Sequence, residues 1–175
     1  MKRLYLLRHA KSSWDLAGEL DFERGLTEHG WNDCALMAEL IQERGIVPDI
    51  VICSGATRAR ETLRGVAKAF PLNTLVEYED AVYRATTEDL LEVLHEVPAK
   101  HEAVMLIGHN TSVHDLAVEI SRESEELVRV ATKFPTAALA EFEVDGEWAD
   151  LGEDSAELTH FTRPKQLRQG ERETL

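Results

Sequence analysis

The chain has 175 residues, of which 43% are hydrophobic, and this length suits one globular domain with a buried core better than two. Its formal net charge of −14 repels nucleic-acid phosphates and anionic membrane surfaces, so neither is expected as a partner. The two cysteines form no evident disulfide framework, and the first apolar run stops at Arg8, too early for a secretory signal. A reducing cytoplasm is therefore the expected location.

Apolar runs and helical patterns alternate along the chain. In chain order we predict a strand over residues 4–7, a helix over 27–44, a strand over 49–53, a helix over 56–70, a strand over 74–78, a helix over 88–97, a strand over 103–107 and a helix over 113–121. Gly45, Pro71 and Pro98 are typical residues for ending the helices that precede them. A last strand over 137–144 is expected to form a hairpin with a partner around Trp148, across Asp145-Gly146.

This alternation implies crossover connections, a mainly parallel sheet and helices on both of its faces, which is a three-layer α/β/α architecture. The continuous apolar runs at residues 49–53 and 103–107 fit strands that are buried on both faces. We expect residues 1–161 to form a single domain. The polar residues 162–175 are expected to be a tail or a surface wrap, and the acidic stretch at residues 121–126 an exposed turn.

Polar side chains follow each of the four predicted parallel strands. They are Arg8 and His9 after the first, Ser54, Arg58 and Arg60 after the second, Glu79 and Asp80 after the third, and His109 and Asn110 after the fourth. Ligands of open α/β sheets bind outside the carboxyl ends of the strands, so these side chains should meet at one edge. Clustered arginines and histidines in an acidic chain are stable where an anion compensates them, and arginine forks match phosphate oxygens. The sequence therefore predicts a phosphoryl-binding site.

His9 is the candidate nucleophile, because a neutral imidazole can attack phosphorus and form a phosphohistidine. Arginines and a second histidine would spread the charge of the transferring phosphoryl oxygens.

Three motifs in this order resemble those of the histidine phosphatase superfamily, also called the phosphoglycerate mutase-like fold. They are LRHAKS at residues 7–12, SGATRARET at 54–62 and GHN at 108–110. The stretch DFERGLTEHG at residues 21–30 resembles the short SixA-type branch of phosphohistidine phosphatases. Two positions depart from the family pattern, since Ala10 and Gly25 stand where a glycine and a proline are usual.

The resemblance implies that His9 is the phosphorylated nucleophile. It implies Arg8, Arg58 and His109 as the other catalytic and substrate-binding residues of the pocket, and Asn110 as a substrate-binding or loop-supporting residue. Arg58 occupies the arginine position of the family pattern, so Arg60 is expected on the helix surface. The implied substrate is a phosphorylated molecule, in the first place a phosphohistidine protein, acted on by a monomer without a cofactor or a metal.

The proton donor is left open between three carboxyl groups. Asp21 is the best match to the short branch, and the equal alternative is that it only pairs with Arg24. Glu79 or Asp80 lies where larger members place a glutamate. An alkoxide leaving group needs a proton, whereas imidazole, with a pKa of about 6.5, leaves more easily. A weakly defined acid is thus compatible with a phosphohistidine substrate.

Other functions remain as alternatives. A cysteine phosphatase is disfavoured because four residues separate Cys53 from Arg58, where that class has five. A zinc site is disfavoured because His109 and His114 are five apart, whereas zinc-binding helices use four. A phosphatase of small phosphomonoesters, a mutase and a non-catalytic phosphate-binding module share the predicted fold, and fold alone does not exclude them.

Overall fold

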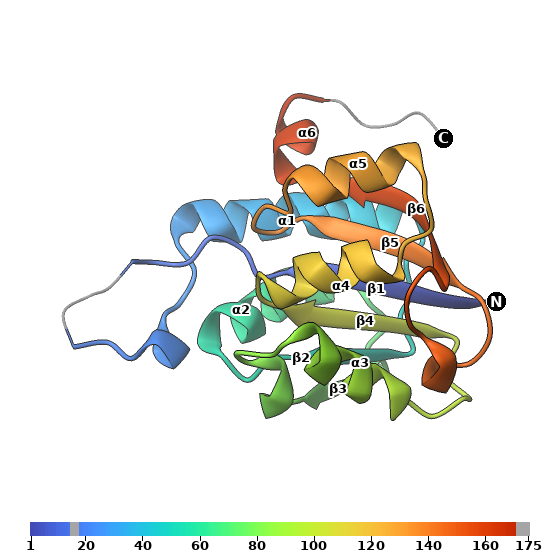
Figure 1. Cartoon of the computed structure of the whole chain (residues 1–175). Helices are drawn as coiled ribbons and strands as arrows, with labels where there is room; N and C mark the ends of the chain where they lie inside the picture. The colour runs from blue at the N-terminus through green and yellow to red at the C-terminus, as the bar shows by residue number, and fades with distance from the viewer. Residues whose placement is uncertain (15–17, 171–175) are drawn as a thin grey trace.

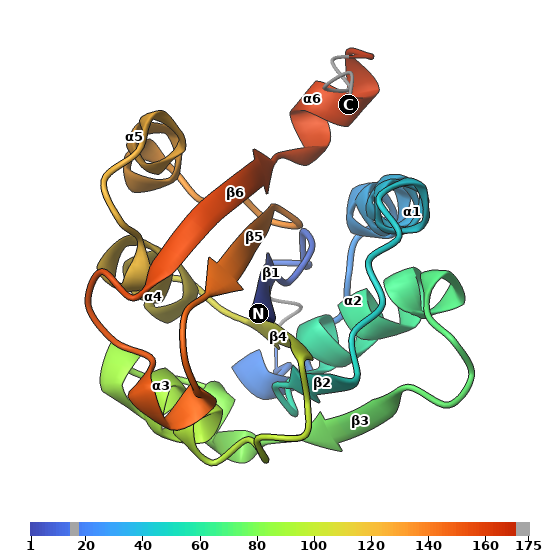
Figure 2. The same ribbon diagram turned by 90° about the vertical axis from the view of Figure 1, so that its right-hand side faces the viewer.

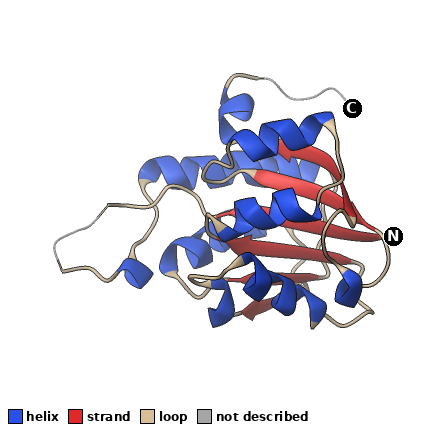
Figure 3. Cartoon of the chain, viewed as in Figure 1, coloured by secondary structure: helices blue, strands red, loops and turns tan. Residues whose placement is uncertain are grey.

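A central six-stranded sheet organises the molecule (Figure 3). Its strands are β1 Lys2–Arg8, β2 Ile50–Cys53, β3 Leu75–Tyr78, β4 Ala103–Gly108, β5 Leu139–Val144 and β6 Ala156–Thr162. The computed structural model describes residues 1–14 and 18–170. The order across the sheet is β3-β2-β4-β1-β5-β6. The first four strands are parallel, and β5 and β6 continue the sheet antiparallel.

Helices cover both faces of this sheet, as the predicted three-layer α/β/α architecture requires (Figure 2). They are α1 Glu28–Glu43, α2 Thr57–Val66, α3 Thr87–His95, α4 Ser112–Ile120, α5 Glu125–Thr132 and α6 Pro164–Arg168. Alternate side chains of β4 enter two separate cores. Val104 and Leu106 pack with α3 and α4, whereas Met105 and Ile107 pack with α1 and α2. Both faces of β4 are therefore buried, and the layered arrangement confirms the fold class.

Helix α1 is positioned against the segment that follows β1. Thr27 caps the helix by accepting a hydrogen bond from the Gly30 amide. Gly30 has no Cβ, and an added one would collide with the carbonyl oxygen of Lys11. The glycine thus lets the first turn of α1 lie directly against the residues after His9.

The predicted hairpin is wrong. The partner of β5 is β6, which is later in the chain, and Trp148 lies in a short 3-10 turn, Trp148–Asp150. Its indole N–H donates to the carbonyl oxygen of His101 at 2.7 Å, and its ring is fully buried. Burial of this large ring against the core takes Trp148 out of the strand register that the turn at Asp145-Gly146 suggested.

The predicted acidic turn is also wrong in part. Ser121 is buried and donates to the carbonyl oxygen of Ala117, and α5 begins at Glu125. Ser124 caps this helix by accepting from the Leu127 amide at 3.2 Å. Residues 122–124 are exposed and lie outside any helix, as predicted, whereas the last two residues of the stretch begin a surface helix.

The predicted tail begins inside the sheet, because Thr162 is the last residue of β6. Helix α6 follows it, with Leu167 buried and Arg168 paired with the carboxylate of Asp33 on α1. Residues 171–175 lie outside the described residues, and the domain boundary at residue 161 stays a prediction. None of the described helices has the length and apolar content needed to cross a membrane.

Candidate active site

His9 stands directly after β1, at the end of the sheet where the parallel strands finish (Figure 1). Its Nδ1 lies 2.7 Å from the carbonyl oxygen of Ala10, an acceptor only, so Nδ1 carries the hydrogen and donates it. The other ring nitrogen, Nε2, then holds a lone pair. The Ala10 amide is in turn fixed, because it donates to Oγ1 of Thr62 at 2.9 Å. The ring is therefore held in one tautomer by the backbone beside it.

Three cationic or hydrogen-donating side chains surround this ring. The rings of His9 and His109 have centroids 5.1 Å apart, and Arg58 is 6% exposed. Arg8 donates through Nη1 to the carbonyl oxygen of Phe134 at 3.0 Å. Three of their nitrogens are buried without a hydrogen-bond partner among the described residues: Arg8 Nε, Arg58 Nε and His109 Nδ1. Buried donors without partners are costly, so a cluster of them indicates a site for an anion.

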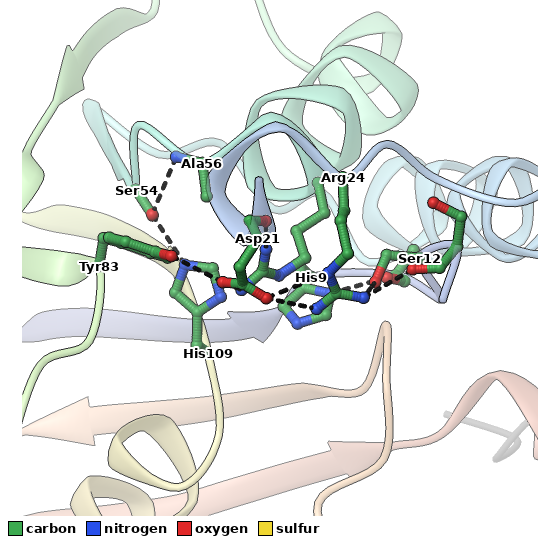
Figure 4. Close-up of polar contacts among 11 residues, drawn as sticks. His9, Ser12, Asp21, Arg24, Ser54, Ala56, Tyr83 and His109 are labelled. Atoms are coloured by element: carbon green, nitrogen blue, oxygen red, sulfur yellow. Dashed lines mark hydrogen bonds and ion pairs between the residues drawn. The ribbon is translucent and has the colours of Figure 1, made fainter. Parts of the chain in front are cut away.

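A short chain of hydrogen bonds orients His109 (Figure 4). The amide of Ala56 donates to Oγ of Ser54 at 3.2 Å, and this hydroxyl lies 2.8 Å from Nε2 of His109. The serine hydroxyl accepts from Ala56 and donates its own hydrogen to Nε2 of His109. Nε2 is then an acceptor, so the hydrogen of the imidazole is on Nδ1. His109 thus offers an N–H donor at the unpartnered Nδ1.

Both histidines are neutral in the folded protein. Burial, the Arg8 and Arg58 charges and the nearby His109 lower the pKa of His9 to about 3, against the opposing hydrogen bond to Ala10. Burial and the same arginines lower the pKa of His109 to about 4. Imidazoles that stay unprotonated keep the lone pair of His9 Nε2 available over the whole physiological range of pH.

Because both histidines are neutral when folded, the free energy of unfolding should fall in acid, and this fall can be measured. An unfolded histidine takes up a proton below about pH 6.5, whereas these two do not until far lower pH, so stability must fall as the pH falls. We expect urea unfolding of the wild type to lose about 2 kcal/mol for each of the two histidines between pH 7 and pH 5. His9→Asn should lose correspondingly less over this interval. If the two proteins lost the same free energy of unfolding between pH 7 and pH 5, this would contradict the buried, neutral state of His9.

Asp21 reaches the site from the loop between β1 and α1. Its carbonyl oxygen and carboxylate accept hydrogen bonds from Arg58 at 2.7 and 3.2 Å. The carboxylate also pairs with Arg24 at 3.0 Å, as one of the two alternatives predicted. The hydroxyl of Tyr83 donates to it at 2.6 Å, and this bond together with Arg58 and Arg24 holds the pKa of Asp21 well below its usual range. Its role as a proton donor stays a prediction that this ionised state does not favour.

The remaining candidates make contacts other than with His9. The Asn110 amide donates to the Phe134 carbonyl at 2.9 Å, the oxygen that Arg8 also contacts, so Asn110 supports this loop. Glu79 accepts from the Ala81 amide and caps a 3-10 turn. Asp80 is exposed at the start of that turn. Arg60 lies on the surface of α2, as predicted, with its guanidinium 4.6 Å from the Tyr78 ring.

Comparisons with known proteins agree with this site. A family model described as histidine phosphatase superfamily (branch 1) matches residues 4–82. The crystal structure of a protein from Agrobacterium tumefaciens, provisionally named phosphohistidine phosphatase SixA, is 33% identical with a TM-score of 0.78, over 93% of this chain and 98% of that one. The chain belongs to the histidine phosphatase superfamily.

Two further relatives extend this result. A protein from Nakamurella multipartitia, also provisionally named phosphohistidine phosphatase SixA, is 27% identical with a TM-score of 0.81, over 93% of this chain and 96% of that one. An uncharacterized protein of Mycobacterium tuberculosis is 29% identical over 91% of this chain and all of its own length. The protein is therefore a phosphatase of the phosphoglycerate mutase-like fold.

Two contributors to this histidine phosphatase site were not predicted. Tyr83 binds Asp21 and places its ring edge-on to His109, with centroids 5.7 Å apart. Thr62 accepts from the Ala10 amide and donates to the carbonyl oxygen of Arg58 at 2.7 Å, so it ties the end of β1 to α2. Thr62 was present in the SGATRARET motif, and Tyr83 lies in the segment that leaves the carboxyl end of β3.

The alternative chemistries find no support in the geometry of this histidine phosphatase. Cys53 is fully buried, and burial raises the pKa of its thiol to about 12, so it is not the thiolate that a cysteine phosphatase needs. His114 packs against the ring of Phe134. Among the described residues no three histidine, cysteine or acidic side chains are grouped to hold a metal ion.

Proposed function

We propose that this enzyme is a phosphohistidine phosphatase that works without a metal, through a phosphoryl group carried on His9. The observation that carries the proposal is the group of three buried donors without partners, Arg8 Nε, Arg58 Nε and His109 Nδ1, beside the one imidazole whose Nε2 has a free lone pair. Donors that are already in place cost no reorganisation when negative charge develops in front of them.

In the first step, Nε2 of His9 attacks the phosphorus of the substrate. The new bond joins Nε2 to phosphorus, and the bond from phosphorus to the substrate nitrogen breaks and leaves its electron pair on that nitrogen. Arg8 and Arg58 hold the equatorial phosphoryl oxygens, and the Nδ1 hydrogen of His109 donates to another. The hydrogen bond from His9 Nδ1 to Ala10 stabilises the positive charge that grows on the attacking ring.

In the second step, a water molecule attacks the same phosphorus from the opposite side. The bond to His9 breaks, Nε2 recovers its lone pair, and the water passes a proton to the phosphate or to solvent. The ring returns to the neutral form that burial favours.

The ionised carboxylate of Asp21 supports a substrate whose leaving group is a nitrogen. A substrate imidazole leaves as a neutral base once its second nitrogen is protonated, and its pKa of about 6.5 lets solvent supply that proton near neutral pH. An alkyl ester needs an acid in the site, and the carboxyl nearest to Arg58 is ionised. The two SixA-named relatives support the same substrate class. A reducing cytoplasm fits the buried, unpaired Cys34 and Cys53, and the monomeric state stays a prediction.

Three substrates test the proposal. They are phosphoserine, p-nitrophenyl phosphate, and a protein whose histidine has been phosphorylated beforehand by phosphoramidate. Each is assayed with and without EDTA. We expect EDTA to change none of the rates. Because no acid assists the departure of an alkoxide, kcat/KM for phosphoserine should be lower than for phosphohistidine by about 10²-fold or more. Equal rates on phosphoserine and phosphohistidine would overturn the substrate assignment, and an EDTA-sensitive rate restored by added metal would overturn the metal-independent chemistry.

A further inference from the structure

A groove of about 710 Å³ lies beside the active site, between α2 and the outer strand β3. Phe22 and Gly55 line its end nearest the site, and Val76 and Tyr78 of β3 form part of one wall. None of the residues that surround His9 in the chemistry described above lines it. The groove is therefore a separate feature of the surface.

A row of ring contacts connects the end of the groove to the active site. The Phe22 ring packs edge-on to the Tyr83 ring with centroids 4.9 Å apart, and Tyr83 packs edge-on to His109. Asp21, which precedes Phe22, contacts Arg58. A chain that places its phosphorylated residue at His9 can therefore continue across Phe22 into the groove.

The wall of the groove that β3 forms is apolar and exposed. β3 is the outer strand of the sheet, and all four of its residues are exposed (Figure 2). Val76 and Tyr78 are 43% and 51% exposed, and Leu72 on the preceding loop is completely exposed. Large apolar side chains gathered at an unpaired strand edge are typical of a surface that binds another chain.

Positive charge lines the helix side of the groove, although the chain as a whole has a net charge of −14. Arg60 and Arg64 are four residues apart on α2, which places them on the same face, and both are exposed. Neither has an ion-pair partner among the described residues. Two carboxylates, Glu23 and Glu61, also line the groove, and the Glu61 carboxylate is directed at the Leu26 amide, from which it accepts a hydrogen bond at 2.6 Å. Like charges at this spacing repel each other, and an anionic partner removes that cost.

We propose that this groove binds the substrate protein itself, through a segment next to its phosphohistidine that combines apolar side chains with carboxylates. The proposal rests on the proposed function and adds the means by which the enzyme selects its substrate. Apolar side chains of the segment cover Leu72 and Val76, and its carboxylates meet Arg60 and Arg64. The phosphoryl pocket then carries the chemistry, and the groove supplies specificity.

Two short phosphohistidine peptides of equal length test the groove, one with leucines and glutamates beside the histidine and one with lysines in place of the glutamates. Free phosphohistidine is the third substrate. For the wild type we expect a higher kcat/KM on the acidic peptide than on the basic one. Arg64→Glu should lower the value for the acidic peptide about fivefold, raise it for the basic peptide, and leave free phosphohistidine unchanged. Leu72→Asp removes an apolar contact that both peptides share and adds a negative charge, so it should lower the value for the acidic peptide more than for the basic one.

Two matched variants control for charge and exposure. Lys165→Glu on α6 and Val128→Asp on α5 make the same changes at exposed positions next to β6, at the edge of the sheet opposite β3, and should leave every rate unchanged. The groove proposal is overturned if Arg64→Glu affects all three substrates equally, or if the wild type hydrolyses free phosphohistidine and shows no preference between the peptides. A wild type that hydrolyses none of the three overturns the proposed function together with the groove.

Discussion

His9→Ala is expected to lower kcat/KM for phosphohistidine by about 10⁴-fold or more, because no other side chain in the pocket can take its place as the attacking atom. His109 is the nearest imidazole, but its Nε2 is engaged by Ser54 and its Nδ1 is the donor. The phosphoryl intermediate should disappear with the rate. Brief reaction of the wild type with radiolabelled substrate should trap an acid-labile, alkali-stable label that His9→Ala lacks.

His114→Ala is the control for this experiment. This histidine packs against Phe134 and is partly buried, so its loss removes an imidazole without touching the donors around His9. We expect its rate to stay close to that of the wild type and its label to be retained. A labelled His9→Ala protein, or turnover within about tenfold of the wild type, would show that the phosphoryl group is carried elsewhere.

Arg58→Ala should be the next most damaging change, with a loss of about 10² to 10³-fold in kcat. Its guanidinium is buried beside the histidines, and its Nε has no hydrogen-bond partner in the part of the chain that the structure describes. Arg58→Lys should recover little of the loss, because an ammonium cannot hold two phosphoryl oxygens in a fork. Steady-state kinetics on phosphohistidine at fixed pH gives the loss for each variant.

Arg60→Ala is the matched control on the same helix. Arg60 contacts the Tyr78 ring on the surface, so its loss should leave free phosphohistidine turnover within about twofold. The melting temperature separates catalysis from folding. Arg58 also donates to the carbonyl oxygen and the carboxylate of Asp21, so we expect its loss to lower the melting temperature as well as the activity. A folded Arg58→Ala protein that keeps more than about a tenth of the wild-type kcat would contradict a role in binding the phosphoryl group.

The parallel part of the sheet could be predicted because each element carries its own signal. The apolar runs of β2 and β4 are continuous since both faces are covered, and α1 repeats buried residues at helical spacing. The antiparallel end could not be predicted in this way. A turn at Gly146 does occur, with φ at +85°, but the chain then buries Trp148 before it returns as β6. Only tertiary packing decides which of two apolar segments becomes the partner of β5.

The candidate residues of the site could be proposed from the sequence, but their arrangement could not. Strand ends nominated His9, Arg8, Arg58 and His109 together with Arg60, Glu79 and Asp80, because topology brings the carboxyl ends of parallel strands together. The family resemblance then selected among them. The side-chain bonds that set the tautomers of His9 and His109 depend on backbone carbonyls and on Ser54, which no spacing reveals. Tyr83 was missed because a lone tyrosine after a strand has no motif, although its position beyond β3 placed it at the right edge.

The strand order has a consequence for how this protein is made. β1 and β2 are not neighbours, because β4 lies between them. Leu4 of β1 pairs with Val104 of β4. A nascent chain that ends near residue 82, where the family model stops, therefore offers β1 no strand to pair with. β1 therefore stays unpaired, on or near the ribosome, until β4 has been synthesised. Long-range pairing of this kind is slow and leaves apolar, aggregation-prone surface exposed in the meantime. The segment that carries most of the recognisable motifs is thus a unit of sequence and not a unit of folding.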